Sequence, residues 1–321
     1  MHRSVLVTGA AGFLGRAFVR HHLSVGDAVH GVDDRSNPHA YWPDELAVAD
    51  RTEADAAAFL GSSAGHRPWD LAYHFAAPVG GRVKIEGDPL FNADSLRLDS
   101  VFFRWAAAQH VPTVVYPSSS AVYGVTLQRR DAVALSEDLF HPASTEWRAP
   151  DEMYGFTKLV GEVLAWKAAP YGVSTLCLRP FSGYGEEQSL EYPVPSIALR
   201  AARHEDPLTI WGSGEQTRDF VHVDDLVGAT AARLDAGIDG YAALNIGSGV
   251  ATSFRTVART FAEIAGYDPV IESDETKPQG VLNRFCDNHQ MLEYYRLRIG
   301  LDDGLRRVLE HVSAHALAVA G

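Results

Sequence analysis

The chain has 321 residues, of which 46% are hydrophobic and 21% are charged. This length allows two domains of ~100–200 residues each, and the composition is that of a globular protein and excludes a disordered or membrane-spanning one. Asp and Glu number 41 against 28 Lys and Arg, which gives a formal charge of -13. Nucleic acid is therefore not expected as a partner, because a chain this acidic repels a phosphate backbone.

Cysteines and long apolar segments are both scarce. The two cysteines, Cys177 and Cys286, are too few for a disulfide framework or a thiolate metal cluster, which predicts a reducing compartment. No apolar stretch reaches the about 20 residues that cross a bilayer, and the first strand pattern begins at Val5, too early for a signal peptide. The histidines do not show metal-ligand spacing with Cys or carboxylates. We expect a cytoplasmic protein with no membrane partner and no metal.

Short β-branched runs alternate with segments of helical periodicity as far as Arg179. Alternation of this kind is typical of βαβ units, which build a parallel sheet covered by helices. The predicted fold class is therefore α/β, a doubly wound parallel sheet of the Rossmann type. We predict strands at 5–7, 28–32, 71–75, 113–116 and 174–178, and helices at 13–23, 54–58, 96–108, 154–169 and, as an amphipathic tail, 301–320.

A glycine turn joins the first predicted strand to the first predicted helix. The segment Thr8-Gly-Ala-Ala-Gly-Phe-Leu-Gly15 carries three glycines. Glycine permits a tight turn and lets the backbone approach a pyrophosphate, whose charge is stabilised at the N-terminus of the following helix. The motif predicts a dinucleotide site formed by Gly9, Gly12, Phe13, Leu14 and Gly15.

Asp33 and Asp34 follow the second predicted strand, at the ~20-residue distance expected of a carboxylate that binds the ribose of NAD. A carboxylate accepts hydrogen bonds from the ribose hydroxyls and repels the 2′-phosphate of NADP, so the pair favours NAD. Arg35 leaves NADP open, because an arginine beside the acidic position accommodates that phosphate. Asp50, which we expect to close another short strand, is predicted to bind the adenine amino group, with a solvated turn residue as the alternative.

Tyr154 and Lys158 stand four residues apart at the start of a predicted helix, which places the phenol and the ammonium on one face. A lysine cation beside a nicotinamide ribose stabilises the phenolate and makes the tyrosine a general base for a sugar hydroxyl. Three consecutive serines, 118–120, follow the strand predicted at 113–116. One of them is expected to lie beside the tyrosine and hold the substrate oxygen.

Together these motifs resemble the extended short-chain dehydrogenase/reductases, specifically the NAD-dependent nucleotide-sugar epimerases and dehydratases. The resemblance spans nearly the whole chain, and its segments follow one another in the family's order. It implies NAD as cofactor and a nucleotide-diphosphate sugar as substrate. Besides the glycine turn, it includes YHFAAP at 73–78, SSSAVYG at 118–124, YGFTK at 154–158, LRPFSGYG at 178–185, IWGSGEQTRDFVHVDD at 210–225, LNIGSG at 244–249 and RFCD at 284–287.

The resemblance assigns roles to individual residues. It makes Tyr154 the base and Lys158 its ribose-bound partner. It makes Ser119, three places before Val122, the catalytic hydroxyl, with its two serine neighbours as alternatives. The cofactor would be lined by His74, Phe75, Ala76 and Ala77, and the substrate would contact Ser120, Ser182, Arg218 and Arg284.

The two implied substrate arginines, Arg218 and Arg284, suit a diphosphate because a guanidinium binds phosphate oxygens in a two-pronged manner. The alternative for each is a salt bridge to one of the many carboxylates. Residues 1–180 would form the NAD-binding domain, with strands near 220–225 and 243–247 returning to it. Residues 181–321 would form mainly the nucleotide-sugar-binding region, a smaller α/β unit.

Some positions depart from the family pattern. Ser182 stands where the family has the asparagine of RPFNVYG, and Ser95 falls near another usual asparagine. The family's dehydratases carry an Asp-Glu pair after their catalytic threonine, whereas here Ser120 and Ala121 follow Ser119. Neither residue supplies the acid or base that eliminates water, which disfavours a 4,6-dehydratase.

The loop at 79–86 carries Arg82, Lys84 and Glu86. It is somewhat similar to the glycine-rich loop of GDP-mannose 3,5-epimerases, which implies that these charges lie near the hexose, with Arg82 and Lys84 as substrate contacts. Those enzymes place a cysteine acid/base where Ala121 stands here, which disfavours a 3,5-epimerase with that chemistry. Whether Lys84 is a replacement base or a solvated loop charge stays open.

The expected function is inversion at C4 of a nucleotide sugar through a transient 4-keto sugar. The alternatives are a 3,5-epimerase, dehydratase or decarboxylase that uses the same ketone, an NADPH reductase, and a non-catalytic dinucleotide-binding module. Family members commonly dimerise through the helices predicted at 96–108 and 154–169, so we expect a homodimer. The apolar residues of those helices fit either an interface or a buried core: Phe102, Phe103, Trp105 and Trp166.

Overall fold

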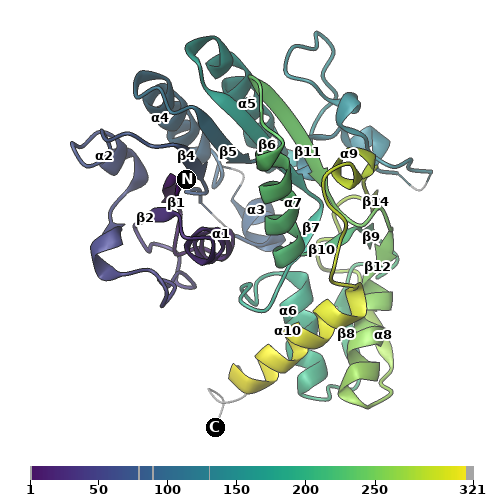
Figure 1. Ribbon diagram of the computed structural model, residues 1–321. Coiled ribbons are helices and arrows are strands. Elements are labelled where there is room, and N and C mark those ends of the chain that lie inside the picture. The colour runs from purple at the N-terminus through teal and green to yellow at the C-terminus, as the bar shows by residue number, and fades with distance from the viewer. Residues whose placement is uncertain (1, 79, 89, 130, 316–321) are drawn as a thin grey trace.

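The framework of the protein is a parallel sheet of seven strands, in the order β11-β6-β5-β4-β1-β2-β3 (Figure 1). The computed structural model describes residues 2–78, 80–88, 90–129 and 131–315. The chain order reverses between β1 and β4, so the crevice at their carboxyl ends is the expected place for a ligand. The strands are β1 Ser4–Thr8, β2 Ala28–Asp33, β3 Arg51–Glu53, β4 Leu71–His74, β5 Thr113–Pro117, β6 Ser174–Pro180 and β11 Tyr241–Ile246.

Helices cover both faces of this sheet, which confirms the predicted fold class. Successive side chains of a strand point to opposite faces. Val5 and Val7 therefore share one core cluster with α1 (Phe13–Ser24) and α7 (Val223–Asp235). Leu6 belongs to a second cluster that contains residues of α2 (Ala56–Leu60), α4 (Asp94–Ala108) and α5 (Glu152–Ala168).

The helix boundaries agree with the sequence-based predictions to within about two residues, and residues 316–320 of the predicted tail helix lie outside the described residues. No helix among the described residues is long and apolar enough to cross a membrane.

Phe102, Phe103 and Trp105 of α4 are buried in the second cluster. These three aromatic residues are therefore core, the second of the two roles considered for them, and do not offer an exposed interface.

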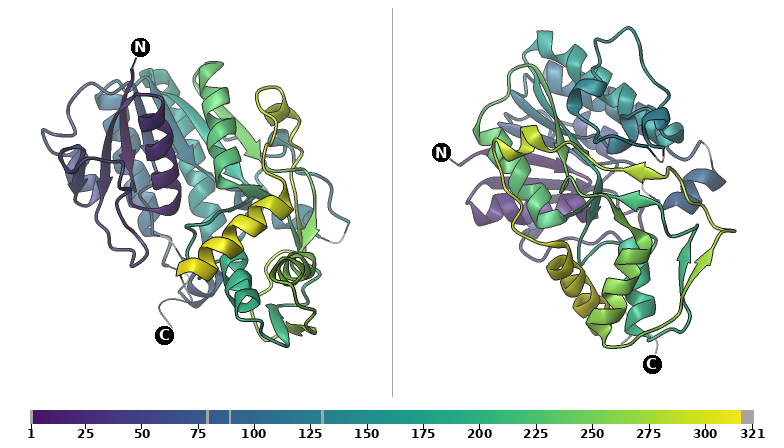
Figure 2. Two further views of the ribbon diagram at one scale, coloured as in Figure 1. Left: turned by 60° about the horizontal axis from the view of Figure 1, so that its bottom comes forward. Right: turned by 90° about the vertical axis from the view of Figure 1, so that its right-hand side faces the viewer.

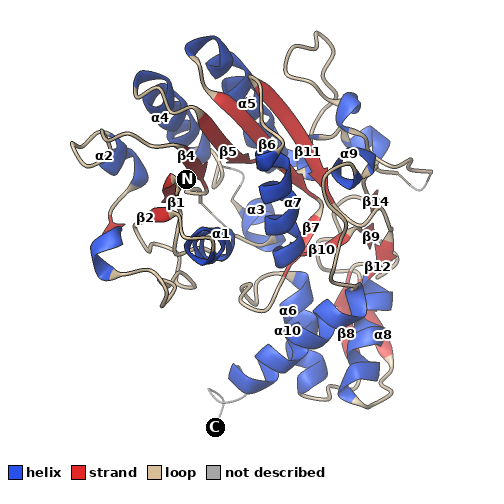
Figure 3. Ribbon diagram, viewed as in Figure 1, coloured by secondary structure: helices blue, strands red, loops and turns tan. Residues whose placement is uncertain are grey.

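The remaining elements form a smaller region at the carboxyl edge of the sheet, where Figure 3 shows several short strands separate from the large sheet. The third core cluster of the molecule belongs to this region and lies among α6, α8 and α10, which are seen side by side in Figure 2. The elements are α3 Arg82–Gly87, β7 Ser182–Tyr184, α6 Pro193–Ala202, β8 Leu208–Trp211, β9 Thr217–Arg218, β10 Phe220–His222, β12 Thr252–Ser253, α8 Phe254–Ala265, β13 Ile271–Asp274, β14 Asn283–Arg284, α9 His289–Leu292 and α10 Leu301–His315.

One part of the predicted domain organisation is wrong. The strand expected at 243–247 returns to the large sheet as β11, beside β6. The strand expected near 220–225 does not, because β10 pairs with β7 in a separate two-stranded sheet. The chain enters α7 at Val223, directly after β10, so this segment contributes three strand residues, and all three are paired with β7.

Candidate active site

The glycine turn after β1 is shaped for close backbone approach. Gly9 has φ of 70°, and a Cβ added there would lie 2.5 Å from the carbonyl carbon of Phe75. A Cβ at Gly15 would lie 2.0 Å from the Gly9 oxygen, so α1 packs directly on the turn. Gly12 is the N-cap of α1, with no side-chain cap and no acidic residue in the first turn. The first N–H groups of α1 are thus presented to an anion, which fits the pyrophosphate of a dinucleotide.

Asp33, the last residue of β2, lies against this turn. Its Oδ2 accepts a hydrogen bond from the Ala11 N–H at 3.0 Å, and its Oδ1 accepts one from the Arg35 N–H at 2.7 Å. Burial raises the pKa of Asp33, and the two backbone hydrogen bonds oppose that shift. Asp34 is exposed and accepts from the Ser36 N–H. Arg35 forms an ion pair of 3.6 Å with Glu53.

The prediction that Asp50 closes a strand is wrong. Asp50 ends a 3-10 turn, Val48–Asp50, and precedes β3. The residue at the carboxyl end of β3, in register with Asp33, is Glu53. Three residues of strand separate Asp50 from that end, which is about 10 Å at the usual rise per residue. The strand itself, Arg51–Glu53, contains no apolar residue, so its sequence carries no alternation and pairing with β2 decides where it begins.

The predicted cofactor-lining segment after β4 runs beside Gly9 through its backbone. The Phe75 N–H donates to the Thr8 carbonyl at 3.0 Å, and the Ala76 N–H lies 3.4 Å from Thr8 Oγ1. Ala77 follows with intermediate exposure. The Phe75 ring packs in the core, 5.1 Å from the ring of Phe18 between centroids, so only the backbone of Phe75 lies at the turn.

His74 does not line the crevice as expected. Its side chain is buried, with Nδ1 3.1 Å from Thr8 Oγ1 and Nε2 3.1 Å from Asp99 Oδ1. Its ring stacks on Phe102 at 4.1 Å between centroids. The residue therefore connects β1, β4 and α4 inside the core.

The first turn of α5 packs directly on the turn that follows β5. A Cβ at Gly155 would lie 2.4 Å from the Ala121 oxygen, which also accepts a hydrogen bond from the Asp151 N–H at 3.0 Å. This contact holds Tyr154 and Lys158 beside the 3-10 turn η2 (Ser120–Val122) and its N-cap, Ser119. Lys158 Nζ lies 5.9 Å from the ring centroid of Tyr154.

The structure distinguishes the three adjacent serines by their partners. The Ser118 hydroxyl donates to the buried Glu162, and the Ser120 hydroxyl donates to the Phe181 carbonyl at 3.4 Å. The Ser119 oxygen accepts from the Ala121 N–H at 3.1 Å, and its O–H donates to no described residue. Ser119 is also the most exposed of the three, at 8%. It is the serine with a proton to offer to a substrate oxygen.

Arg218 and Arg284 are register partners on the parallel strands β9 and β14. The Arg218 guanidinium donates to neutral acceptors, among them the carbonyls of Thr217 at 2.7 Å, Val281 at 2.9 Å and Gln279 at 3.5 Å. Arg284 is buried and forms an ion pair of 2.6 Å with Asp151, three residues before Tyr154. The structure thus shows the salt bridge that was the alternative for Arg284, and it brings both arginines together.

Asp219 is a residue of this site that the sequence reasoning did not single out, although it follows Arg218 in the quoted motif. Its buried carboxylate accepts N–H donors from Ser248 at 2.6 Å, Gly249 at 2.9 Å and Cys286 at 3.1 Å. These hydrogen bonds tie β9 to the chain after β11 and to the chain after β14. Asp219 therefore fixes the backbone next to both arginines.

The loop that leads into α3 packs against the segment before α6. A Cβ at Gly81 would lie 2.6 Å from the Glu191 oxygen. The next residue, Tyr192, was not predicted as a site residue. Burial raises the pKa of Tyr192, and the Tyr154 phenol adds to that shift. Lys84 is exposed, with Nζ 4.2 Å from the ring centroid of Phe91. The side chains of Arg82 and Glu86 lie outside the described part of the structure.

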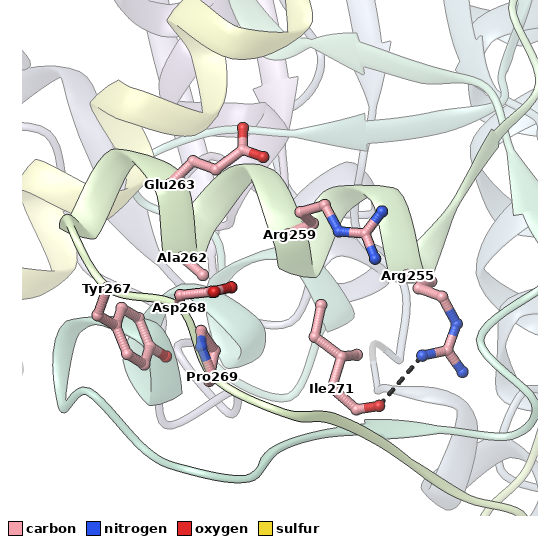
Figure 4. Close-up of a pocket in the computed structure, with 8 residues that line it drawn as sticks. All are labelled: Arg255, Arg259, Ala262, Glu263, Tyr267, Asp268, Pro269 and Ile271. Atoms are coloured by element: carbon pink, nitrogen blue, oxygen red, sulfur yellow. Dashed lines mark hydrogen bonds between the residues drawn. The ribbon is translucent and has the colours of Figure 1, made fainter.

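Two pockets of the described surface lie away from these residues. One, of about 220 Å³, is lined by residues of α8 and the segment after it, from Arg255 to Ile271 (Figure 4). There the Arg255 guanidinium donates to the Ile271 carbonyl at 3.1 Å. The other, of about 340 Å³, lies between residues 38–41, 186–190 and the end of α10. Neither contains a predicted site residue. The candidate site is therefore defined by its motifs and contacts.

Residues 5–247 match the model of the "NAD dependent epimerase/dehydratase family". A dTDP-4-dehydro-6-deoxy-D-allose reductase of Streptomyces bikiniensis is 30% identical, over 96% of this chain and 97% of the relative. A UDP-glucose 4-epimerase of Mycolicibacterium smegmatis is also 30% identical, over 95% of this chain and 97% of the relative.

Solved structures agree with these matches. MoeE5 in complex with UDP-glucuronic acid and NAD is 30% identical, with a TM-score of 0.81 over 97% of this chain and 99% of that chain. The UDP-glucose 4-epimerase of Thermotoga maritima has a TM-score of 0.83 over 98% of this chain and 99% of that chain, but at 23% identity it shows the fold alone.

Proposed function

Because the chain belongs to the NAD-dependent epimerase/dehydratase family, we propose that it inverts C4 of a nucleoside-diphosphate hexose through a transient 4-keto sugar. The family match and the NAD-bound relative confirm NAD as the cofactor. The observation that supports the proposal most directly is the packing of Gly155 on Ala121, which holds Tyr154 and Lys158 beside Ser119.

The residues present fit NAD. The uncapped start of α1 and the positive φ of Gly9 leave room and N–H groups for its pyrophosphate, and Asp33 offers acceptors for the adenosine ribose hydroxyls. Lys158 is proposed to hold the nicotinamide ribose. When bound, NAD accepts a hydride from the sugar carbon and returns it.

The chain's own groups would move the proton. Tyr154 takes the proton of the C4 hydroxyl as the ketone forms, and Ser119 donates a hydrogen bond to the same oxygen. The Lys158 ammonium stabilises the phenolate of Tyr154. After the ketone has turned in the site, Tyr154 returns the proton to the oxygen, and the hydride returned to the opposite face of C4 leaves the centre inverted.

Further residues are proposed to hold the rest of the substrate. Arg218 on β9 would face the diphosphate, beside Arg284 on β14, whose guanidinium is already paired with Asp151. The proposed contacts of the sugar or its phosphates are Lys84, Arg82 and Ser182. Ser120 is no longer among them, because it is buried and its hydroxyl is bonded to the Phe181 carbonyl. Because Ala121 is apolar and the Ser120 hydroxyl is bonded to a backbone carbonyl, this site lacks the acid/base pair of a 4,6-dehydratase. A homodimer and a cytoplasmic location complete the proposal.

A 4-keto-sugar reductase is the second candidate. It is favoured by the 30% identity to the Streptomyces bikiniensis reductase over almost the whole chain. The two reactions share the transfer of a hydride to the C4 ketone but differ in stoichiometry. An epimerase regenerates its cofactor in each cycle, whereas a reductase consumes one equivalent per product.

Proton NMR in D₂O distinguishes these functions. The purified protein would be given NAD and, in turn, UDP-, GDP- and dTDP-hexoses and hexuronic acids, with the Tyr154→Phe variant as control. We expect a new C4 epimer without ring deuterium and without net cofactor consumption. Deuterium at C3 or C5, or loss of water or carbon dioxide, would replace C4 inversion by chemistry next to the ketone. Stoichiometric consumption of NADH or NADPH with a keto sugar would establish the reductase, and no turnover in any assay would favour a binding module.

A further inference from the structure

A buried ion pair includes a residue of α5, the helix that carries Tyr154 and Lys158. Glu162 of α5 and Arg179 of β6 are both 0% exposed, and their contact is two-pronged: Arg179 Nε to Glu162 Oε1 at 2.9 Å and Arg179 Nη2 to Glu162 Oε2 at 2.7 Å. Buried charges are costly unless their remaining hydrogen-bonding capacity is satisfied. Arg179 also donates to the Tyr123 hydroxyl at 2.9 Å and to the carbonyls of Glu137 at 3.2 Å and Phe140 at 3.0 Å.

The carboxylate of Glu162 also accepts hydrogen bonds from two hydroxyls. Ser118 donates to Oε1, and Tyr241, on the edge strand β11, donates to Oε2. The two donors come from different places in the fold. Ser118 is next to Ser119, whereas Tyr241 lies in the large sheet and belongs to no proposed catalytic element.

Glu162 is placed to align the two halves of the site. It follows Lys158 by four residues and Tyr154 by eight, so all three lie along one face of α5. Through its hydrogen bond to Ser118, the same side chain is joined to the backbone that carries Ser119. The ion pair with Arg179 restrains the carboxylate, because moving it would break a buried contact between charges.

We propose that Glu162 is a positioning residue, which fixes Ser119 relative to Tyr154 and Lys158 through the Ser118 hydroxyl. This inference rests on the proposed function, since it assumes that Ser119 and Tyr154 act on one substrate oxygen. The opposing view is that the hydroxyls only help to stabilise a buried charge. On that view, removal of either hydroxyl, Ser118 or Tyr241, should have the same effect on kcat. If Glu162 positions Ser119, only removal of the Ser118 hydroxyl should lower kcat.

The test compares Ser118→Ala with Tyr241→Phe, because each removes one hydroxyl from the same carboxylate. Tyr241→Phe also removes an acceptor of Arg179 Nη2 at 3.3 Å, so it disturbs the ion pair at least as much. We expect Ser118→Ala to lower kcat about 10- to 100-fold, the scale of a small misplacement of a catalytic group. Its KM and NAD affinity should stay within about twofold of the parent, since the substrate and cofactor contacts are retained. Tyr241→Phe should keep kcat within about twofold, and Ser118→Thr, which restores the hydroxyl, should recover most of the loss.

Amide hydrogen exchange gives a readout that needs no substrate. Faster exchange is expected in residues 118–124 of Ser118→Ala and not of Tyr241→Phe, with similar melting temperatures for the two. Equal kcat and equal exchange in both variants would overturn the positioning role. If the parent protein formed no C4 epimer from any nucleotide sugar, the proposed function would fail instead. The exchange comparison would still test the positioning role, so the two failures are distinguishable.

Discussion

At the scale of the residue, chemically identical side chains acquire different roles from their partners. Ser118, Ser119 and Ser120 are adjacent, yet the first is bonded to a buried carboxylate and the third to a backbone carbonyl. Only Ser119 keeps a donor that no described residue uses. No property of the serines themselves distinguishes them, because the difference lies in Glu162 and Phe181, which are far away in sequence.

Tyr154→Phe tests the proposed base. The substitution removes one oxygen and leaves the ring, so NAD affinity should stay within about twofold. Turnover should fall ~100-fold or more, the scale expected for loss of a general base. Steady-state kinetics on the substrate identified by NMR measures turnover, and isothermal titration with NAD measures binding. Normal turnover would remove Tyr154 from the mechanism.

At the scale of the element, the unit formed by β1, the glycine turn and α1 depends on close packing of α1 on the backbone of the turn. Gly15→Ala would place a methyl group 2.0 Å from the Gly9 oxygen, so α1 or the turn must move. We expect a loss of NAD affinity of at least about tenfold together with lower stability. Gly61→Ala is the matched control, because its Cβ would meet only ordinary contacts at 3.5 Å or more and its φ is negative. Isothermal titration with NAD compares the two, and unchanged affinity in Gly15→Ala would contradict the proposed site.

The proposed dimer involves α4 and α5. Since Phe102, Phe103 and Trp105 are core, the exposed apolar residue of this helix pair is Phe156, at 45% exposure. Phe156→Glu should shift a homodimer toward monomer by placing a charge in the apolar contact, as measured by analytical ultracentrifugation. Tyr171→Glu, just beyond α5 and 67% exposed, is the control and should not change the sedimentation. A dimer that survives Phe156→Glu would exclude this face.

At the scale of the whole molecule, ion pairs join the large sheet and its helices to the C-terminal region. Arg284 binds Asp151, and Arg16 of α1 binds Glu187 at 2.9 Å. Burial alone would raise the pKa of Glu187, but hydrogen bonds from Arg20 and Arg16 lower it to about 2. The net charge of -13 therefore coexists with local pairs of arginine and carboxylate that hold the two regions together.

A buried histidine makes the stability of the whole molecule depend on pH. His22 is 1% exposed, between Asp27 at 2.7 Å and the Tyr73 hydroxyl at 2.8 Å. Burial lowers its pKa to about 4, despite the hydrogen bond to Asp27 that raises it. Between pH ~6.5 and that value the unfolded chain takes up the proton and the folded one does not. The free energy of unfolding should therefore fall as the pH drops, by up to about 1.4 kcal/mol per pH unit.

Urea unfolding of His22→Gln at several pH values between 7.5 and 4.5 checks this dependence. The slope of stability against pH should be smaller than in the parent, whatever the variant's stability at neutral pH. His66→Gln, at an exposed position, should keep the parental slope. Equal slopes in the parent and His22→Gln would show that His22 does not titrate in this range.

The strands and helices of the large sheet were predictable because their signals are local. Apolar periodicity and the glycine turn located most elements of the sheet: β1, α1, β2, β4, β5, α5 and β6. The segments TGAAGFLG, SSSAVYG and YGFTK resemble the family's motifs, and that resemblance pointed to Gly9, Ser119, Tyr154 and Lys158. The alternation of strands and helices was enough to predict a parallel sheet, since a crossover helix covers each pair of strands. These patterns did not depend on which distant residues would meet.

Only the tertiary structure decided what depends on pairing between distant segments. Register with β2 put Glu53, not Asp50, at the carboxyl end of β3, and pairing with β7 kept β10 out of the large sheet. The tertiary structure also decided the partners of Arg284 and Ser118. Arg284 binds Asp151, 133 positions away, and Ser118 binds Glu162, 44 positions away. A sequence pattern reports which side chains are apolar or charged, but the energy of a buried charge depends on the particular groups that surround it.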